Sequence, residues 1–131
     1  MNLVENIKIS EGFRGEPYND SLGKPTIGFG TLLPLSESES ELILKSRLHT
    51  KMAQLVKAEP FMQELPSDVK DTLYEMSYQL GVGGLLKFKK MWKALKEGDY
   101  KEAYIQALDS RWAEQTPNRA EKLANVFLGY V

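Results

Sequence analysis

Hydrophobic residues recur at helical spacing through most of the chain. The longest such stretch, residues 37–58, begins with a Ser-Glu repeat that is typical of a helix N-terminus, and Pro60 ends it. Residues 60–131 continue as several shorter segments with apolar residues on one side, which predicts a bundle of helices. In the run from Lys87 to Lys96, the aromatic residues are predicted to face the core and the lysines to face solvent.

The first helix is predicted over residues 2–11, with Gly12 ending it. Leu3, Ile7 and Glu11 share one stripe of this helix, so we expect Glu11 to be half-buried at the helix end. Burial and the negative end of the helix dipole both favour the protonated carboxyl group, the form that a general acid needs. Without other support, an ordinary glutamate at a fraying helix end is the commoner interpretation.

Residues 13–32 have a different pattern, with turn formers followed by a short alternating run, and are predicted to form a β-hairpin. Asp20 lies in the turn, and Thr26 begins the second strand. Gly28 and Gly30 leave one face of that strand nearly bare, so a ligand could lie against the backbone beside the Thr26 hydroxyl. Crowding of this face by the protein itself would explain the two glycines equally well.

Together these elements predict an α+β fold that is mainly α. We expect one domain, residues 1–131, with a hairpin lobe at about residues 12–35 and a long connecting helix at about 37–58. The helical lobe is predicted to combine residues 1–11 and 60–131. Because a lone hairpin is not stable by itself, it must lean on helices, and the cleft between the lobes is the expected ligand site.

Composition narrows the function classes. The net charge is −1, so no overall field draws the chain to nucleic acid or to a membrane, and neither is expected as a stable partner. The chain has no cysteine and one histidine, His49, among polar neighbours, so we expect no metal site and no organic cofactor. Glu5 interrupts the start where a signal peptide needs an apolar run, and no segment is long enough to span a membrane. We therefore expect the protein to accumulate in the cytoplasm.

The spacing of the polar residues near the start resembles the phage-type lysozymes, glycoside hydrolase family 24, and especially the T-even phage lysozymes. Glu11, Asp20 and Thr26 match the family pattern Glu-x8-Asp-x5-Thr, and the family's Ile-Gly-x-Gly follows at Ile27. A second match comprises Ser110-Arg111-Trp112 and Gln115-Thr116-Pro117-Asn118-Arg119-Ala120, and a weaker one runs from Met76 to Gly81. The resemblance covers most of the chain and implies a lysozyme-like fold.

The resemblance also implies roles for individual residues. Glu11 would be the general acid, Asp20 the base that activates water, and Thr26 a residue that holds this water. The expected substrate-binding residues are Gly30, Gln79, Gln115, Thr116 and Arg119, of which Arg119 matches the family arginine that approaches the catalytic glutamate. The sequence departs from the T-even phage lysozymes at two places. Thr31 stands in place of a histidine, and the region between Thr31 and Pro60 is shorter than in those enzymes.

The implied reaction is hydrolysis, by an inverting route, of the β-1,4 bond between N-acetylmuramic acid and N-acetylglucosamine in bacterial peptidoglycan. The implied setting is host cell lysis by a monomeric endolysin, which leaves the host cytoplasm through a holin-type membrane pore to reach the wall. Two alternatives stay open. One is a lytic transglycosylase that uses Glu11 alone, and the other is a non-catalytic module that binds glycan or, through the basic run, nucleic acid.

Overall fold

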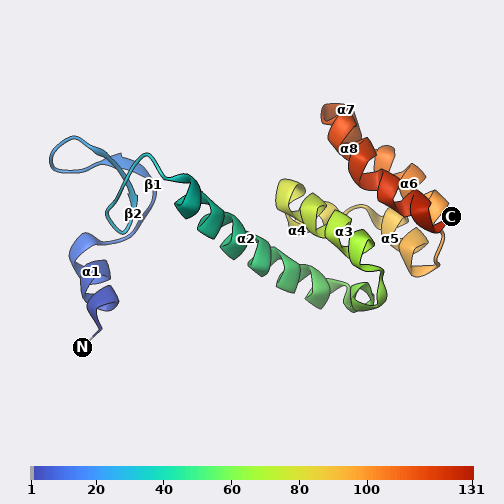
Figure 1. The fold of residues 1–131 in the computed structure, drawn as a ribbon, viewed down its shortest axis with the longest axis horizontal. Coiled ribbons are helices and arrows are strands. Elements are labelled where there is room, and N and C mark those ends of the chain that lie inside the picture. Colours follow the sequence, from blue (N-terminus) through green and yellow to red (C-terminus); the bar gives the residue numbers. More distant parts are fainter. Residues whose placement is uncertain (1) are drawn as a thin grey trace. The chain divides into compact units, whose positions relative to one another are not determined.

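The structure, a computed structural model, describes residues 2–131 and divides into two compact units, Met1–Ile43 and Leu44–Val131. The boundary falls within the long helix α2 (Glu37–Ala58), which has the predicted extent and is one continuous helix (Figure 1). Helices dominate, and the described residues form a single small antiparallel sheet. This confirms the predicted α+β, mainly α, class. The predicted cleft and single domain stay predictions.

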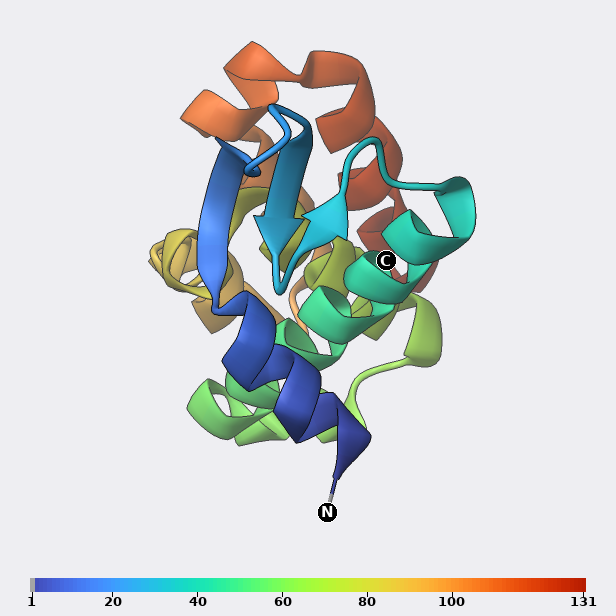
Figure 2. The same ribbon diagram turned by 90° about the vertical axis from the view of Figure 1, so that its left-hand side faces the viewer.

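The first unit contains the predicted hairpin and one strand more. Its elements are α1 (Leu3–Glu11), β1 (Arg14–Asn19), β2 (Pro25–Gly28) and β3 (Thr31–Leu32). The three strands lie side by side in the order β1-β2-β3 (Figure 2). The prediction that the alternating strand continues past Gly28 is wrong, because Gly28 and Gly30 both have positive φ and the chain reverses there. Ile27 consequently pairs with Thr31.

Helix α1 ends at Gly12 as predicted, and the first unit by itself does not bury the apolar stripe of this helix. Leu3 and Ile7 are 71% and 46% exposed, and no residue of the helix is buried. Within this unit, Lys8 and Glu11 near the end of the helix contact Phe29 and Gly30 in the turn after β2. Residues 2–11 group with this sheet, whereas the sequence analysis assigned them to the helical lobe.

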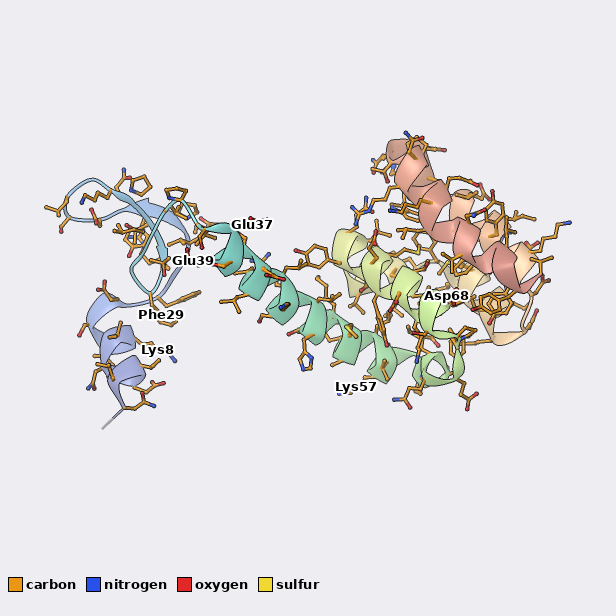
Figure 3. All side chains as sticks on the ribbon, viewed as in Figure 1. Lys8, Phe29, Glu37, Glu39, Lys57 and Asp68 are labelled. Atoms are coloured by element: carbon orange, nitrogen blue, oxygen red, sulfur yellow. The ribbon has the colours of Figure 1, made fainter. Side chains whose placement is uncertain are left out.

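The start of α2 has the capping box that the Ser-Glu repeat predicted. The Glu39 backbone N–H donates to Ser36 Oγ at 3.1 Å, and the Ser36 N–H donates to Glu39 Oε1 at 2.9 Å. The hydrogen bond from the Ser36 backbone N–H, with a smaller contribution from the Ser36 hydroxyl, lowers the pKa of the Glu39 carboxyl group. Glu37 and Glu39 both lie in the first turn of the helix (Figure 3), where negative charge is favourable.

The second unit is a helical bundle built around one core (Figure 1). After the end of α2 it contains the 3-10 helix η1 (Pro60–Glu64), α3 (Ser67–Leu80), α4 (Val82–Leu86), α5 (Lys89–Lys96), α6 (Tyr100–Leu108), α7 (Arg111–Gln115), α8 (Pro117–Ala124) and the 3-10 helix η2 (Asn125–Tyr130). The buried residues include Val69, Leu73 and Met76 of α3, at the helical spacing that the sequence predicted. Within residues 2–131, we find no helix with both the length and the apolar character that crossing a membrane demands.

Candidate functional site

Asp20 is held by its own turn. One carboxylate oxygen, Oδ1, accepts hydrogen bonds from the backbone N–H groups of Leu22 at 2.8 Å and Lys24 at 2.9 Å. Gly23, with φ +78°, allows the turn to close and donates its N–H to the Asp20 carbonyl at 2.9 Å. The second oxygen, Oδ2, has no hydrogen bond to any described residue, so it remains available to a water or a ligand.

Thr26 is tied to the same turn. Its side chain is buried, with 2% exposure, and its hydroxyl donates to the Lys24 carbonyl at 2.9 Å. That carbonyl also accepts the backbone N–H of Asp20 at 2.9 Å, so one peptide group positions both residues. Because the Thr26 proton is directed at the carbonyl, the hydroxyl oxygen can act only as an acceptor toward a third group. The hairpin thus brings Asp20 and Thr26 together.

Glu11 is the last residue of α1, and its carboxyl group lies against Gly30. A Cβ atom built on Gly30 would lie 2.6 Å from Glu11 Cδ and 3.0 Å from Cγ, and would overlap Oε2. Glu11 therefore occupies the space at Gly30 that the sequence analysis offered to a ligand, and the alternative explanation, crowding by the protein itself, applies there. At Gly28 a Cβ atom would meet nothing within 4 Å.

Within the first unit the Glu11 side chain is exposed, so the residues of this unit do not supply the expected half-burial, which stays a prediction. The contacts around it explain how the helix end is nevertheless held. Lys8 lies over the ring of Phe29 at 5.3 Å (Figure 3), and the rings of Phe29 and Phe13 are 5.3 Å apart. Phe29 directly precedes Gly30, so these contacts join the last turn of α1 to the turn between β2 and β3. All three residues predicted to be catalytic lie in the first unit.

The second unit holds a separate polar cluster centred on Gln79 of α3. The Trp112 indole N–H donates to Gln79 Oε1 at 2.9 Å, and Gln79 Nε2 donates to Thr116 Oγ1 at 3.3 Å. The Thr116 hydroxyl in turn donates to the Trp112 carbonyl at 3.1 Å. This closed set of hydrogen bonds fixes the side-chain amide of Gln79 and joins α3 to the junction of α7 and α8.

Arg119, on α8, pairs with Glu75 on the same side of α3. The Nε–Oε2 distance is 3.3 Å, and the two side chains are 42% and 50% exposed. Glu75 precedes Gln79 by one helical turn, so Arg119 and Thr116 both face this side of α3. Gln115, at the end of α7, is exposed. Glu75 was not predicted from the sequence, although its i,i+4 spacing from Gln79 was a usable signal, and Trp112 was given no role.

The described residues offer no cluster suited to a metal ion. Among residues 2–131, no three or more histidine, cysteine, aspartate or glutamate side chains are grouped so that they could hold one. His49 is exposed on α2. Every buried side-chain nitrogen or oxygen in the described part of the chain has a hydrogen-bond partner.

Comparison with known proteins places this geometry in context. The family model described as phage lysozyme matches residues 8–125. Two proteins of Dictyostelium discoideum named probable T4-type lysozymes 2 and 1 are each 27% identical, over 96% and 95% of this chain and 93% and 92% of their own lengths. The pre-baseplate central spike protein Gp5 of Enterobacteria phage T4 is 26% identical over 98% of this chain, which spans only 28% of that protein.

The three alignments are 157–159 positions long, more than the 131 residues of this chain. These relatives therefore carry residues that this chain lacks.

Proposed function

The chain belongs to the phage lysozyme family and is thus a glycoside hydrolase, and from this premise we propose that it hydrolyses the β-1,4 bond between N-acetylmuramic acid and N-acetylglucosamine in bacterial peptidoglycan. One observation carries the proposal. A single unit contains a carboxyl group at a helix end that lies against Gly30, a second carboxyl group with one unoccupied oxygen, and an acceptor hydroxyl, the last two oriented by hydrogen bonds within one turn.

Glu11 is the proposed general acid, which protonates the glycosidic oxygen as the leaving sugar departs. Two features support this role. The carboxyl group is exposed and so accessible to a bulky polymer, and it lies against Gly30, at the turn that joins β2 to β3. This contact places the carboxyl group in the same unit as Asp20 and Thr26, and correct placement of a reacting group favours the reaction.

Asp20 is the proposed base, and Thr26 the group that orients the attacking water. The Thr26 oxygen accepts one hydrogen of this water, because its own proton is directed to the Lys24 carbonyl. Asp20 Oδ2 accepts the other as the water attacks the anomeric carbon. A water between carboxylate and sugar is the arrangement of an inverting glycosidase, whose two carboxyl groups stand about 6.5–9.5 Å apart. We therefore propose inversion at the anomeric carbon.

In the second unit, Gln79, Gln115, Thr116 and Arg119 are the proposed substrate-binding residues. Gln79 Nε2 donates one hydrogen to Thr116 and keeps a second, and the Arg119 ion pair engages only Nε, which leaves the Nη groups as donors. Such fixed donors suit the hydroxyl and N-acetyl groups of a glycan. Gly30 contributes by leaving room for the Glu11 carboxyl group. The biological role that we propose is host cell lysis by a monomer that starts in the host cytoplasm and crosses the membrane through a holin-type pore.

The test compares the parent chain with Glu11→Gln and Asp20→Asn on purified peptidoglycan. Both amides keep the size of the side chain, and the amide oxygen introduced by Asp20→Asn can still accept the two backbone hydrogen bonds. General acid catalysis contributes about 10²–10⁴-fold, so the release of reducing ends by Glu11→Gln should fall by at least that factor. Glu16→Gln, an exposed position on β1, is the matched control and should behave as the parent.

Early-time NMR of the anomeric proton then reports the stereochemistry. An inverting hydrolase gives an α reducing end first. A β product would contradict the proposed role of Asp20. A 1,6-anhydro product would identify a lytic transglycosylase, and undiminished release of reducing ends by Glu11→Gln would remove Glu11 from the mechanism.

A further inference from the structure

Helix α5 and the residue pair before it carry the densest positive charge in the chain. Residues 87–96 contain five lysines and no acidic residue, although the whole chain has 17 basic and 18 acidic residues. All five lysine side chains are exposed. A chain without net positive charge therefore presents one strongly basic face, which we call the lysine face and define as Lys87, Lys89, Lys90, Lys93 and Lys96.

The side of α5 opposite the lysine face is packed in the core. Met91, Trp92, Ala94 and Leu95, on the opposite side of α5, are at most 3% exposed. The Trp92 indole N–H donates to the Leu85 carbonyl at 3.0 Å. The backbone of α5 is thus fixed in the bundle core, and the lysines project from a defined ridge and not from a mobile segment.

Three of the lysines border one hollow. Lys89, Lys93 and Lys96, spaced i, i+4 and i+7, line a cavity of about 460 Å³ together with Glu59. Lys96 is already paired with Glu59 at 3.0 Å. Within the described chain, Lys89 and Lys93 make no ion pair, and their i,i+4 spacing separates them by about 6 Å along the helix axis. The hollow therefore offers two uncompensated ammonium groups to a ligand.

We propose that the lysine face binds carboxylate groups of the peptides that substitute the glycan chains of peptidoglycan, and so retains the enzyme at the wall independently of catalysis. The identity of this polymer rests on the function proposed above. Flexible lysine ammonium groups act as point charges that need no bidentate geometry, which suits carboxylates repeated along a polymer. Glu59 and Glu97 also line the hollow, and their negative charge repels a densely charged phosphate polymer. The repulsion is weaker for carboxylates that are spaced along a polymer.

The same structure argues against two other anionic partners. Proteins that bind single-stranded nucleic acid stack bases on exposed aromatic rings, whereas Trp92 is buried, Phe88 is half-buried against the core and the run contains no arginine. Helices that lie on membranes insert an apolar face, and the apolar face of α5 is occupied by the bundle core. Charge alone is left at the surface, as retention on a polycarboxylate requires.

The experiment measures binding of the full chain to purified, insoluble peptidoglycan sacculi by co-sedimentation, with Glu11→Gln present in every protein. Lys89→Gln with Lys93→Gln is the test pair. Lys101→Gln with Lys122→Gln is the control pair, because both positions are exposed in the same unit and the net charge changes equally. At about 10 mM ionic strength, where charges reach about 30 Å, the test pair should bind about two- to thirtyfold more weakly than the control pair. At about 150 mM the difference should shrink, because the reach falls to about 8 Å.

Two further arms identify the ligand. Amidation of the carboxyl groups of the sacculi should reduce parent binding to the level of the test pair. Vesicles of phosphatidylglycerol and phosphatidylcholine should bind test and control pairs equally. Equal binding of the two pairs to sacculi, unchanged binding after amidation, or a loss confined to vesicles would each overturn the proposal. Release of reducing ends by the chain with native Glu11 is measured in parallel, and its absence would contradict the proposed function without changing the binding result.

Discussion

The contact between Glu11 and Gly30 makes a sharp prediction about Gly30→Ala. The added methyl group would lie 2.6 Å from Glu11 Cδ, whereas ordinary contacts of a Cβ atom begin at 3.4 Å. The carboxyl group must therefore move by about 0.8 Å, the difference between these two distances. Displacement of a reacting group by about 1 Å can cost about 10²-fold in rate, so we expect a loss of that order in the release of reducing ends.

The effect of Gly30→Ala on the free energy of unfolding should be modest. Gly30 has φ +72°, and an L-residue in the left-handed region costs about 1–2 kcal/mol. Moving Glu11 should lower the unfolding free energy little further, because its exposed side chain can rotate toward solvent. Gly28→Ala is a matched control with φ +68° and nothing within 4 Å of the added Cβ atom. The two variants should therefore lose similar stability, about 2–8 °C in Tm per kcal/mol.

The assay compares both alanine variants with the parent in thermal unfolding and in activity on purified peptidoglycan. The expected pattern is equal Tm values and an activity of Gly30→Ala about 10²-fold below that of Gly28→Ala. If the two variants are equally active, the contact with Gly30 does not position the acid, and the reasoning fails. If Gly30→Ala is far less stable than Gly28→Ala, the site is more tightly packed than the exposed Glu11 side chain implies.

Three other predictions concern the remaining polar contacts. Thr26→Val removes the hydroxyl that donates to the Lys24 carbonyl, which keeps its hydrogen bond from the Asp20 N–H, so the free energy of unfolding should fall by about 0.5–1.5 kcal/mol. Activity should fall sharply in Thr26→Val and be restored in Thr26→Ser, and full activity of the valine variant would refute the water-binding role. Trp112→Phe leaves Gln79 Oε1 without its donor and should lower the unfolding free energy in urea by about 1–3 kcal/mol, and an unchanged midpoint would show that the cluster is not structural. Activity should survive exhaustive chelation in a simple buffer, and loss that a divalent ion reverses would reveal a metal site.

Features that depend on neighbours in the sequence were predictable. The helix ending at Gly12, the turn closed by Gly23 and the capping box of Ser36 and Glu39 all involve residues at most four positions apart. The exposed lysines and buried aromatic residue of α5 followed from helical periodicity, because the bundle covers one side of this helix. In each case local chemistry and the final structure favour the same conformation.

Features that depend on distant contacts were not predictable in this way. Strand β3 exists because two glycines reverse the chain after Gly28, and a two-residue strand gives no periodic signal. Glu75 and Arg119 are 44 positions apart, so their pairing needs α3 and α8 to be placed first. The stripe of α1 suggested burial from spacing alone, but the partner surface in its own unit is too small to cover it.

The proposed acid and base should therefore differ in how they respond to change. The side-chain hydrogen bonds of Asp20 and Thr26 span at most four residues, and the strand partners of Thr26 are Tyr18 and Leu32, so this half of the site is contained in one small sheet and its turn. Its geometry should tolerate the loss of residues elsewhere, including the positions that the relatives carry and this chain lacks. Glu11 instead depends on contacts between a helix end and the turn at Gly30, which distant changes can shift. Substitutions that alter packing should consequently impair proton delivery by Glu11 before they disturb the water held by Asp20 and Thr26.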